Sequence, residues 1–226
     1  MGQHITLTAS DGHKPGAYRA DPSGTPKGGM VVVQEIFGVN RHIRSVCDRL
    51  ATAGYSAIAP ALFDRITPNF ESGYSPEEVA TAREFVAKPD WDAMMRDTQA
   101  AFDIVQSAGP TGIVGFCMGG SIAYLAAARI AGLSAAVGYY GGQIIRFADE
   151  QEKCPMQLHF GEKDDHIPQT DVGTIRQKHP KAEIYTYPAG HGFKCDERGS
   201  YYEPSAKLAW ERTLKFLDTH LTREGT

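Results

Sequence analysis

The stretch Thr111-Gly-Ile-Val-Gly-Phe-Cys-Met-Gly-Gly120 decides how this chain folds. The apolar residues before Gly115 are typical of a buried strand, and the alanine-rich run from Ser121 to Ala131 has apolar residues at helical spacing. Between them lies a G-x-C-x-G motif centred on Cys117. A sharp turn from a strand into a helix crowds the backbone, which explains the glycines two positions to either side of the central residue. The stretch therefore predicts a strand, a tight turn and a helix, with Cys117 at the turn.

A thiol at such a turn is well placed to react. The helix dipole and the backbone N–H groups at a helix N-terminus favour the thiolate form. The alternative is that Cys117 is a buried, small apolar residue, as free cysteines often are. The motif by itself leaves both interpretations open.

On both sides of this stretch, apolar runs of strand length alternate with helical patterns. Strands are expected at residues 30–33, 55–59, 133–140, 154–160 and 182–187. Helices are expected after a cap at Asn40 as far as Ala53, from residue 75 onward, and at 91–107, 170–179 and 203–220. Two short strands at residues 4–9 and 16–20 flank Asp11-Gly12, which is typical of a hairpin turn. Because strands that alternate with helices form parallel sheets, we predict one α/β domain over residues 1–226. Its sheet is doubly wound and mainly parallel, with an N-terminal antiparallel hairpin.

The composition is that of an ordinary globular protein. The chain has 226 residues, of which 42% are hydrophobic and 22% charged, and a net charge of −4. This balance gives no reason to expect nucleic acid or a membrane as a partner. No signal peptide is visible, and the four cysteines form neither a disulfide framework nor a zinc pattern. A reducing cytoplasmic compartment and a monomer or small homo-oligomer are expected.

Four residues with reactive side chains follow predicted parallel strands: Glu35, Cys117, Asp164 and His191. Ligands of open parallel sheets bind beyond the carboxyl ends of the strands. A thiol needs a proton acceptor, an imidazole supplies one near neutral pH, and a carboxylate fixes the imidazole tautomer. Each residue also has a structural alternative: His191 is one of eight histidines, and Asp164 and Asp165 are alternatively the polar residues of a turn.

Six segments of the chain resemble the dienelactone hydrolases, also called carboxymethylenebutenolidases, which have the α/β-hydrolase fold. They occur in order and, with their surroundings, extend over about residues 30 to 217. The segments are Gln34-Glu-Ile-Phe-Gly-Val-Asn40, Pro60-Ala-Leu-Phe-Asp-Arg65, Gly115-Phe-Cys-Met-Gly-Gly120, Gly138-Tyr-Tyr-Gly141, Gly161-Glu-Lys-Asp164 with Ile167-Pro168, and Ala189-Gly-His-Gly-Phe193.

The resemblance implies a role for each matching residue. Cys117 would attack the substrate carbonyl, with His191 as base and Asp164 as its orienting acid, since the family pattern puts the acid three residues after Gly161. Glu35 would hydrogen-bond the resting thiol and take its proton. The backbone N–H groups of Ile36 and Met118 would bind the oxyanion. Arg65 would bind the carboxylate of the substrate, and Tyr139 would line the pocket.

One position departs from the family. Members that cleave dienelactone have a second arginine four residues beyond the histidine, and here that residue is Cys195. Lys194 and Arg198 lie near it in sequence and are the candidates to compensate. The departure affects the substrate prediction more than the fold or the nucleophile.

We therefore expect a hydrolase that cleaves a small carboxylate-bearing lactone, such as dienelactone, in the breakdown of aromatic compounds. Neither a metal nor an organic cofactor is expected. Three alternatives stay open at this point. They are a general carboxylesterase for uncharged acyl esters, a catalytically silent binding protein with the same fold, and a metal site made by Cys117, His191 and Cys195.

Overall fold

The computed structural model describes residues 2–221, which divide into two compact units. The first unit ends at Thr111, and the second comprises Gly112–Leu221. The prediction of a single domain over the whole chain stays a prediction.

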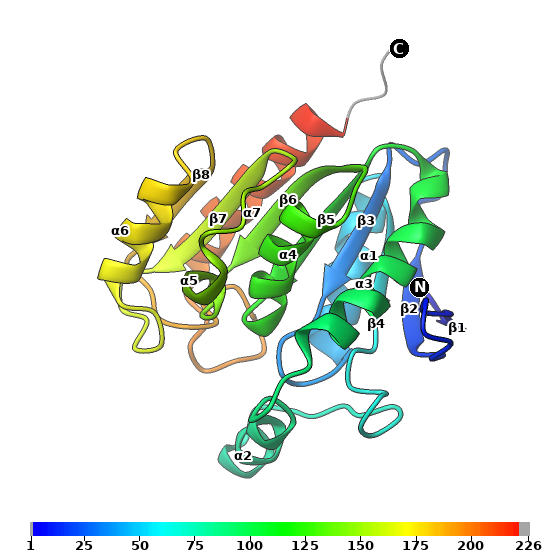
Figure 1. Cartoon of the computed structure of the whole chain (residues 1–226), viewed down its shortest axis with the longest axis horizontal. Coiled ribbons are helices and arrows are strands. Elements are labelled where there is room, and N and C mark those ends of the chain that lie inside the picture. Colours follow the sequence, from blue (N-terminus) through cyan, green and yellow to red (C-terminus); the bar gives the residue numbers. More distant parts are fainter. Residues whose placement is uncertain (1, 222–226) are drawn as a thin grey trace. The chain divides into compact units, whose positions relative to one another are not determined.

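The first unit holds four strands in the order β1-β2-β4-β3 (Figure 1). They are β1 (Gln3–Thr6), β2 (Gly16–Ala20), β3 (Gly29–Val33) and β4 (Ser56–Pro60). β1 and β2 pair antiparallel and form the hairpin expected around Asp11-Gly12, and β2 also pairs antiparallel with β4. β3 and β4 are parallel, with Met30 opposite Ala57. Both parallel strands are buried throughout, as expected for strands that are covered on both faces.

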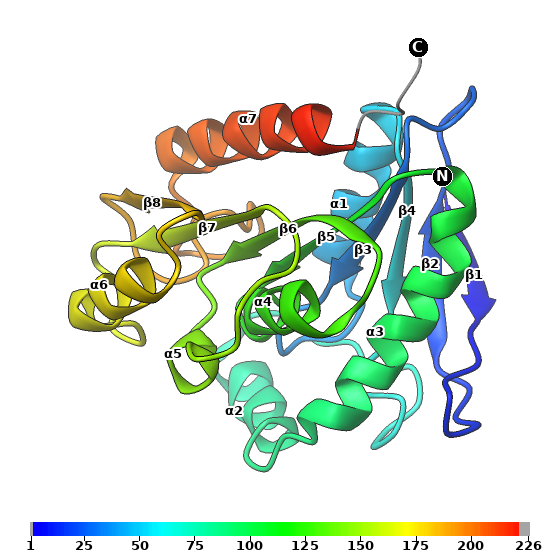
Figure 2. The same ribbon diagram turned by 45° about the horizontal axis from the view of Figure 1, so that its top comes forward.

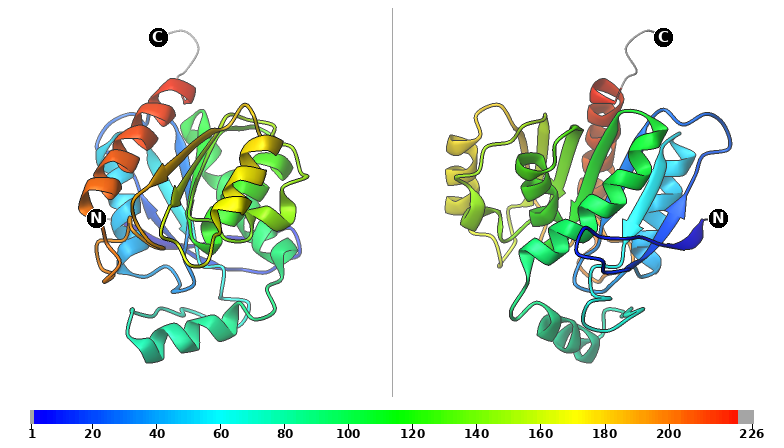
Figure 3. Two further views of the ribbon diagram at one scale, coloured as in Figure 1. Left: turned by 90° about the vertical axis from the view of Figure 1, so that its left-hand side faces the viewer. Right: turned by 45° about the vertical axis from the view of Figure 1, so that its right-hand side comes forward.

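The helices of the first unit begin at residues whose side chains cap them. The Asn40 side chain accepts a hydrogen bond from Ile43 N at the start of α1 (Arg41–Thr52), and the Asp90 side chain accepts one from Ala93 N at the start of α3 (Trp91–Val105). A single 3₁₀ turn, Gln106–Ala108, follows α3. Both helices pack on β3 and β4, from opposite faces (Figure 3). α2 (Pro76–Phe85) starts with a capping box at Ser75.

The second unit continues the alternation of strands and helices. Its strands have the order β5-β6-β7-β8 and are β5 (Thr111–Phe116, of which residues from Gly112 on belong to this unit), β6 (Leu133–Tyr139), β7 (Met156–Gly161) and β8 (Glu183–Tyr187). β6, β7 and β8 are parallel, with Tyr139 opposite His159 and His159 opposite Tyr185. α4 (Met118–Arg129) and α7 (Glu203–His220) pack on opposite faces of this part of the sheet (Figure 2). α5 (Ile144–Phe147) and α6 (Gln169–Lys178) complete the unit.

Close backbone contact fixes α4 against the end of β6. All residues of α4 except Arg129 are buried. A Cβ atom on Gly120 would lie only 2.4 Å from the Tyr139 carbonyl oxygen, so only glycine allows this approach. The N-terminal turn of α4 therefore lies directly against the segment that follows β6.

These observations confirm the predicted fold class, a mainly parallel, doubly wound α/β fold with an N-terminal antiparallel hairpin. The structure adds the short helix α5, which the sequence patterns did not indicate. Among residues 2–221, no helix combines the length and the apolar character that crossing a membrane requires.

Candidate active site

Cys117 lies at the strained turn between β5 and α4. Its φ of +54° is in the left-handed region, which is costly for any residue with a Cβ atom. The turn needs glycine at position 115, because a Cβ atom there would lie 1.8 Å from the Gly119 carbonyl oxygen. Cys117 N donates a hydrogen bond to the Tyr139 carbonyl oxygen at 3.0 Å, which ties the turn to the end of β6. The thiol is partly exposed, whereas Cys47, Cys154 and Cys195 are buried.

His191 and Asp164 join Cys117 in one hydrogen-bonded chain. His191 Nε2 lies 3.1 Å from Cys117 Sγ, and His191 Nδ1 lies 2.8 Å from Asp164 Oδ2. Asp164 follows β7 and His191 follows β8, so residues 74 positions apart in the sequence meet beyond the carboxyl ends of the strands. The arrangement has the order and geometry of a nucleophile, a base and an orienting acid.

Backbone hydrogen bonds hold the two loops in register. Lys163 N donates to the Ala189 carbonyl oxygen at 3.0 Å, just before Asp164 and His191. The second oxygen of the Asp164 carboxylate accepts a hydrogen bond from His166 N at 2.9 Å. Because both carboxylate oxygens have partners, the side chain of Asp164 is fixed in rotation as well as in position.

Electrostatics favour a protonated imidazole at His191. Burial opposes the charged form, but the negative charge on Cys117 and the hydrogen bonds with Asp164 and Cys117 outweigh it. Together they raise the pKa of His191 to about 10. An imidazolium at this position stabilises negative charge that develops on a neighbouring sulfur.

Two aromatic rings contact the imidazole of His191. The ring centroids of Tyr140 and of His166 each lie 5.1 Å from that of His191. Tyr140 is fully buried, whereas His166 is exposed. No role is predicted for either ring from the sequence.

Tyr139, the predicted pocket residue, points elsewhere. Its ring stacks on His159 with centroids 4.4 Å apart, and its hydroxyl group hydrogen-bonds Thr213 at 2.6 Å inside the second unit. Tyr140 follows the last residue of β6 and has a positive φ, so its side chain leaves the backbone in a different direction. The structure thus places Tyr140, rather than Tyr139, against His191.

Met118 and Lys194 are two further predicted site residues, and both belong to the second unit. The backbone amide of Met118 is the first of α4, where amides lack an acceptor within the helix. Lys194 is buried, and its ammonium group lies 4.8 Å from the centroid of the Trp210 ring. Within residues 112–221, no three of the His, Cys, Asp and Glu side chains bring ligand atoms within 4.8 Å of one another. This gives the alternative metal site at Cys117, His191 and Cys195 no support.

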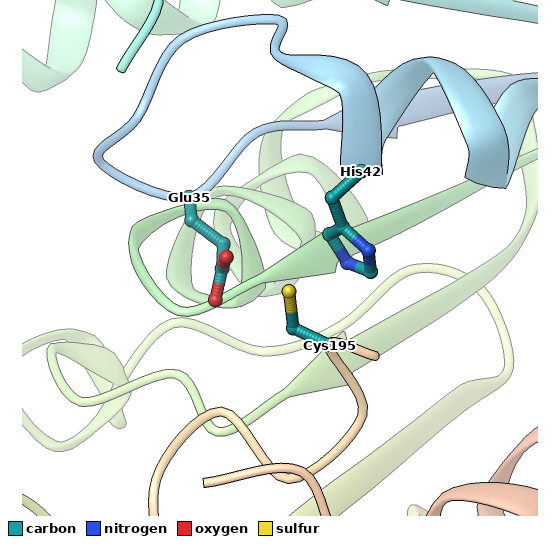
Figure 4. A group of neighbouring side chains, drawn as sticks. All are labelled: Glu35, His42 and Cys195. Carbon is teal, nitrogen blue, oxygen red and sulfur yellow. The ribbon is translucent and has the colours of Figure 1, made fainter. Parts of the chain in front are cut away.

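Glu35 and Ile36 belong to the first unit and follow β3 directly. Glu35 is buried in the loop after β3, and His42 is buried in the first turn of α1 (Figure 4). Cys195, which Figure 4 also labels, is a buried free thiol of the second unit. The roles predicted for Glu35 and Ile36 stay predictions.

Arg65, the predicted ligand of a substrate carboxylate, is held by two carboxylates of the first unit itself. Its guanidinium donates to Asp97 at 2.7 and 2.8 Å and to Asp11 at 2.8 and 3.0 Å. The side chain of Asp97 is fully buried, and that of Arg65 is 20% exposed. A substrate carboxylate at Arg65 would therefore compete with Asp11 and Asp97 for the guanidinium.

Comparisons with known proteins agree with this fold. The model of the dienelactone hydrolase family matches residues 16–221. A carboxymethylenebutenolidase of Pseudomonas putida is 33% identical over 231 aligned positions, which cover 96% of each chain. A crystal structure from Klebsiella pneumoniae subsp. pneumoniae MGH 78578, provisionally named a dienelactone hydrolase, is 35% identical. It superposes with a TM-score of 0.83 and covers 96% of this chain and 99% of that one. The chain therefore belongs to the dienelactone hydrolase family and is a hydrolase of that type.

Proposed function

We propose that this protein hydrolyses a small lactone or ester through a thioester on Cys117, with His191 as the proton carrier and Asp164 as its orienting acid. The observation that carries the proposal is the hydrogen-bonded chain from Asp164 through His191 to the Cys117 thiol, at 2.8 and 3.1 Å. A structural cysteine would require neither a strained backbone nor an imidazole at its sulfur. The same observations speak against a catalytically silent binding protein.

Acylation begins with the thiolate of Cys117. The sulfur attacks the substrate carbonyl carbon, a C–S bond forms, and the carbonyl oxygen becomes an oxyanion. The backbone N–H of Met118 follows Cys117 directly and lies at the N-terminus of α4, which is the positive end of the helix dipole. In this proposal it donates a hydrogen bond to that oxyanion. The C–O bond of the ester or lactone then breaks, and His191 transfers its Nε2 proton to the leaving oxygen.

Deacylation needs the same imidazole as a base, and the surroundings of His191 explain how it changes role. Once the sulfur carries an acyl group it has no negative charge, so the main influence that raises the pKa of His191 is lost. Burial, which opposes the charged form, then lowers the pKa. The neutral imidazole takes a proton from water, the hydroxide oxygen bonds to the carbonyl carbon, and the C–S bond breaks to release the acid and regenerate the thiolate.

The family resemblance favours a substrate that carries a carboxylate, such as dienelactone. In this proposal a cationic side chain binds the substrate carboxylate, and Arg65 and Lys194 are the candidates. Breakdown of aromatic compounds is the metabolic setting that such a substrate implies.

A specific observation favours a second candidate, a general carboxylesterase for uncharged acyl esters. The guanidinium of Arg65 is bound by Asp11 and Asp97, and the ammonium of Lys194 lies over the Trp210 ring. Both predicted cations are thus already engaged within their own units. Cys195 also stands where the resemblance would put a second arginine.

Turnover of dienelactone and of p-nitrophenyl acetate tests the proposal, with Cys117→Ala as the control. We expect both activities to depend on Cys117 and kcat/KM to be higher for the charged lactone. A higher kcat/KM for the neutral ester selects the carboxylesterase. Hydrolysis that Cys117→Ala leaves intact would refute the thioester mechanism.

The role of Glu35 is tested separately. The resemblance assigns it the proton of the resting thiol, so Glu35→Gln is expected to slow acylation more than deacylation. Equal rates in the wild-type protein and in Glu35→Gln would remove Glu35 from the proposal without affecting Cys117, His191 and Asp164.

A further inference from the structure

Tyr140 is a fully buried aromatic residue in direct contact with the imidazole of His191. The two rings are tilted by 59°, with centroids 5.1 Å apart. The Tyr140 ring also packs edge-on against Phe193, two residues beyond His191, with centroids 5.5 Å apart. The tyrosine thus touches both the imidazole and the loop that carries it.

The backbone of Tyr140 is strained. Its φ of +39° lies in the left-handed region, which bulky residues rarely adopt and which glycine adopts at no cost. Three residues in the described part of the chain that are not glycine have positive φ, and another of them is Cys117. Strain at a bulky residue persists only where the side chain offsets its cost, and such residues cluster at functional sites.

The strained segment is held from both sides. Tyr140 N donates to the His159 carbonyl oxygen of β7 at 2.7 Å, and the preceding carbonyl accepts from Cys117 N at 3.0 Å. On the other side, a Cβ atom on Gly141 would lie 2.8 Å from Ser121 N of α4. Tyr140 is therefore part of the same rigid backbone that holds the nucleophile.

The imidazole of His191 needs such a support at one stage of the reaction. In the resting state, hydrogen bonds fix the ring at both nitrogens, through Asp164 and Cys117. Once the sulfur is acylated, the hydrogen bond to Cys117 is lost and Asp164 alone fixes the ring, at one nitrogen. A neighbouring ring with a fixed position then limits the rotation of the imidazole about that single bond. His166 is exposed, so the buried Tyr140 is the more rigid of the two rings in contact.

We propose that Tyr140 positions His191 for deacylation through the packing of its ring, and that its hydroxyl group is not required. This inference rests on the thioester mechanism proposed above. It assigns to Tyr140 a role that the hydrogen-bonded chain of Asp164, His191 and Cys117 does not supply.

Rapid mixing with p-nitrophenyl acetate separates the two half-reactions, because the first release of p-nitrophenol reports acylation and the steady state reports deacylation. Tyr140→Phe keeps the ring and should retain both rates within about threefold. Tyr140→Asn removes the ring but tolerates the left-handed backbone, and should slow deacylation at least about tenfold while acylation changes less. Tyr140→Gly relieves the strain and should show the same defect, which guards against a variant that fails to fold.

Tyr124 provides the matched control. It is also a buried tyrosine whose ring packs on a histidine, His179, with centroids 5.3 Å apart. Tyr124→Asn should lower the melting temperature but leave the ratio of the two rates unchanged, because His179 is not part of the chain at Cys117.

Three outcomes would overturn the inference. They are equal deacylation rates in Tyr140→Asn and the wild-type protein, a deacylation defect of the same size in Tyr140→Phe, and the same change of ratio in Tyr124→Asn. If the wild-type protein forms no acyl-enzyme at all, the thioester mechanism itself fails. If instead the wild-type protein shows a burst and the Tyr140 variants show the same burst and the same deacylation rate, only the role of Tyr140 is refuted.

Discussion

Replacement of Asp164 by asparagine tests how the imidazole is oriented. The side-chain oxygen of asparagine would still accept the hydrogen bond from His166 N, now 2.9 Å from the carboxylate. Its NH₂ group would then face His191 Nδ1, which the carboxylate now binds at 2.8 Å. Two donors cannot face each other, so the imidazole would take the tautomer with its proton on Nε2. That tautomer cannot accept a proton from the thiol or from water.

The size of the effect follows from the lost charge. The Asp164 side chain is fully buried and that of His191 is 13% exposed, so solvent screens the pair only partly. For unit charges about 4 Å apart at an effective dielectric constant of about 20, the interaction is about 4 kcal/mol. Loss of that stabilisation of the imidazolium corresponds to a decrease in kcat/KM of roughly 10³-fold.

The assay is kcat/KM for p-nitrophenyl acetate between pH 6 and pH 9, together with the melting temperature. Asp165→Asn is the matched control, because Asp165 is the adjacent, exposed carboxylate and should leave kcat/KM within about twofold of wild type. A loss of less than tenfold in Asp164→Asn, or a larger loss in Asp165→Asn, would refute the assignment of the orienting acid.

Three further predictions concern other residues. Cys117→Ser should lose most activity on both lactones and esters, because a hydroxyl is far harder to deprotonate than a thiol; turnover equal to wild type would contradict this. Burial and the charge of Arg212 lower the pKa of His159 to about 3. When the pH falls below 6.5, the ordinary pKa of histidine, this residue therefore takes up a proton in the unfolded state but not in the folded state. His159 should therefore lower the free energy of unfolding by about 2 kcal/mol between pH 7 and pH 5, measured in urea titrations as the difference between the wild-type protein and His159→Gln. Arg65→Ala should cost about 3 kcal/mol in the same measurement, because the buried Asp97 loses its partner, and adding Asp97→Asn should restore much of it. If Arg65 also binds substrate, Arg65→Ala will raise KM for a charged lactone but not for a neutral ester.

Much of the architecture could be predicted because local patterns and tertiary structure agree. The apolar runs fall in buried strands, Asn40 caps a helix, and Gly115 and Gly120 flank a turn at which a larger residue would clash. Asp164 and His191 could be predicted as site residues because ligands of open parallel sheets bind beyond the carboxyl ends of the strands. The choice of Asp164 over Asp165 depended on the family pattern.

The surroundings of Arg65 and Tyr140 could not be predicted in the same way. Arg65 meets Asp97 and Asp11, 32 and 54 residues away in the sequence, and no local pattern reports such distant pairs. Tyr140 has a left-handed backbone conformation, which tyrosine rarely adopts, so the residue type by itself predicts a different conformation. In both cases tertiary contacts override what the sequence indicates.

The burial of Cys47, Cys154 and Cys195 has a practical consequence for studying this enzyme. Among residues 2–221 it leaves Cys117 as the thiol open to a soft electrophile in the folded state. A fluorescent chloroacetamide should therefore attach one dye per functional molecule without any engineering of the chain. The intensity of that single label would count the competent molecules in a preparation, so that rates can be expressed per working site rather than per milligram.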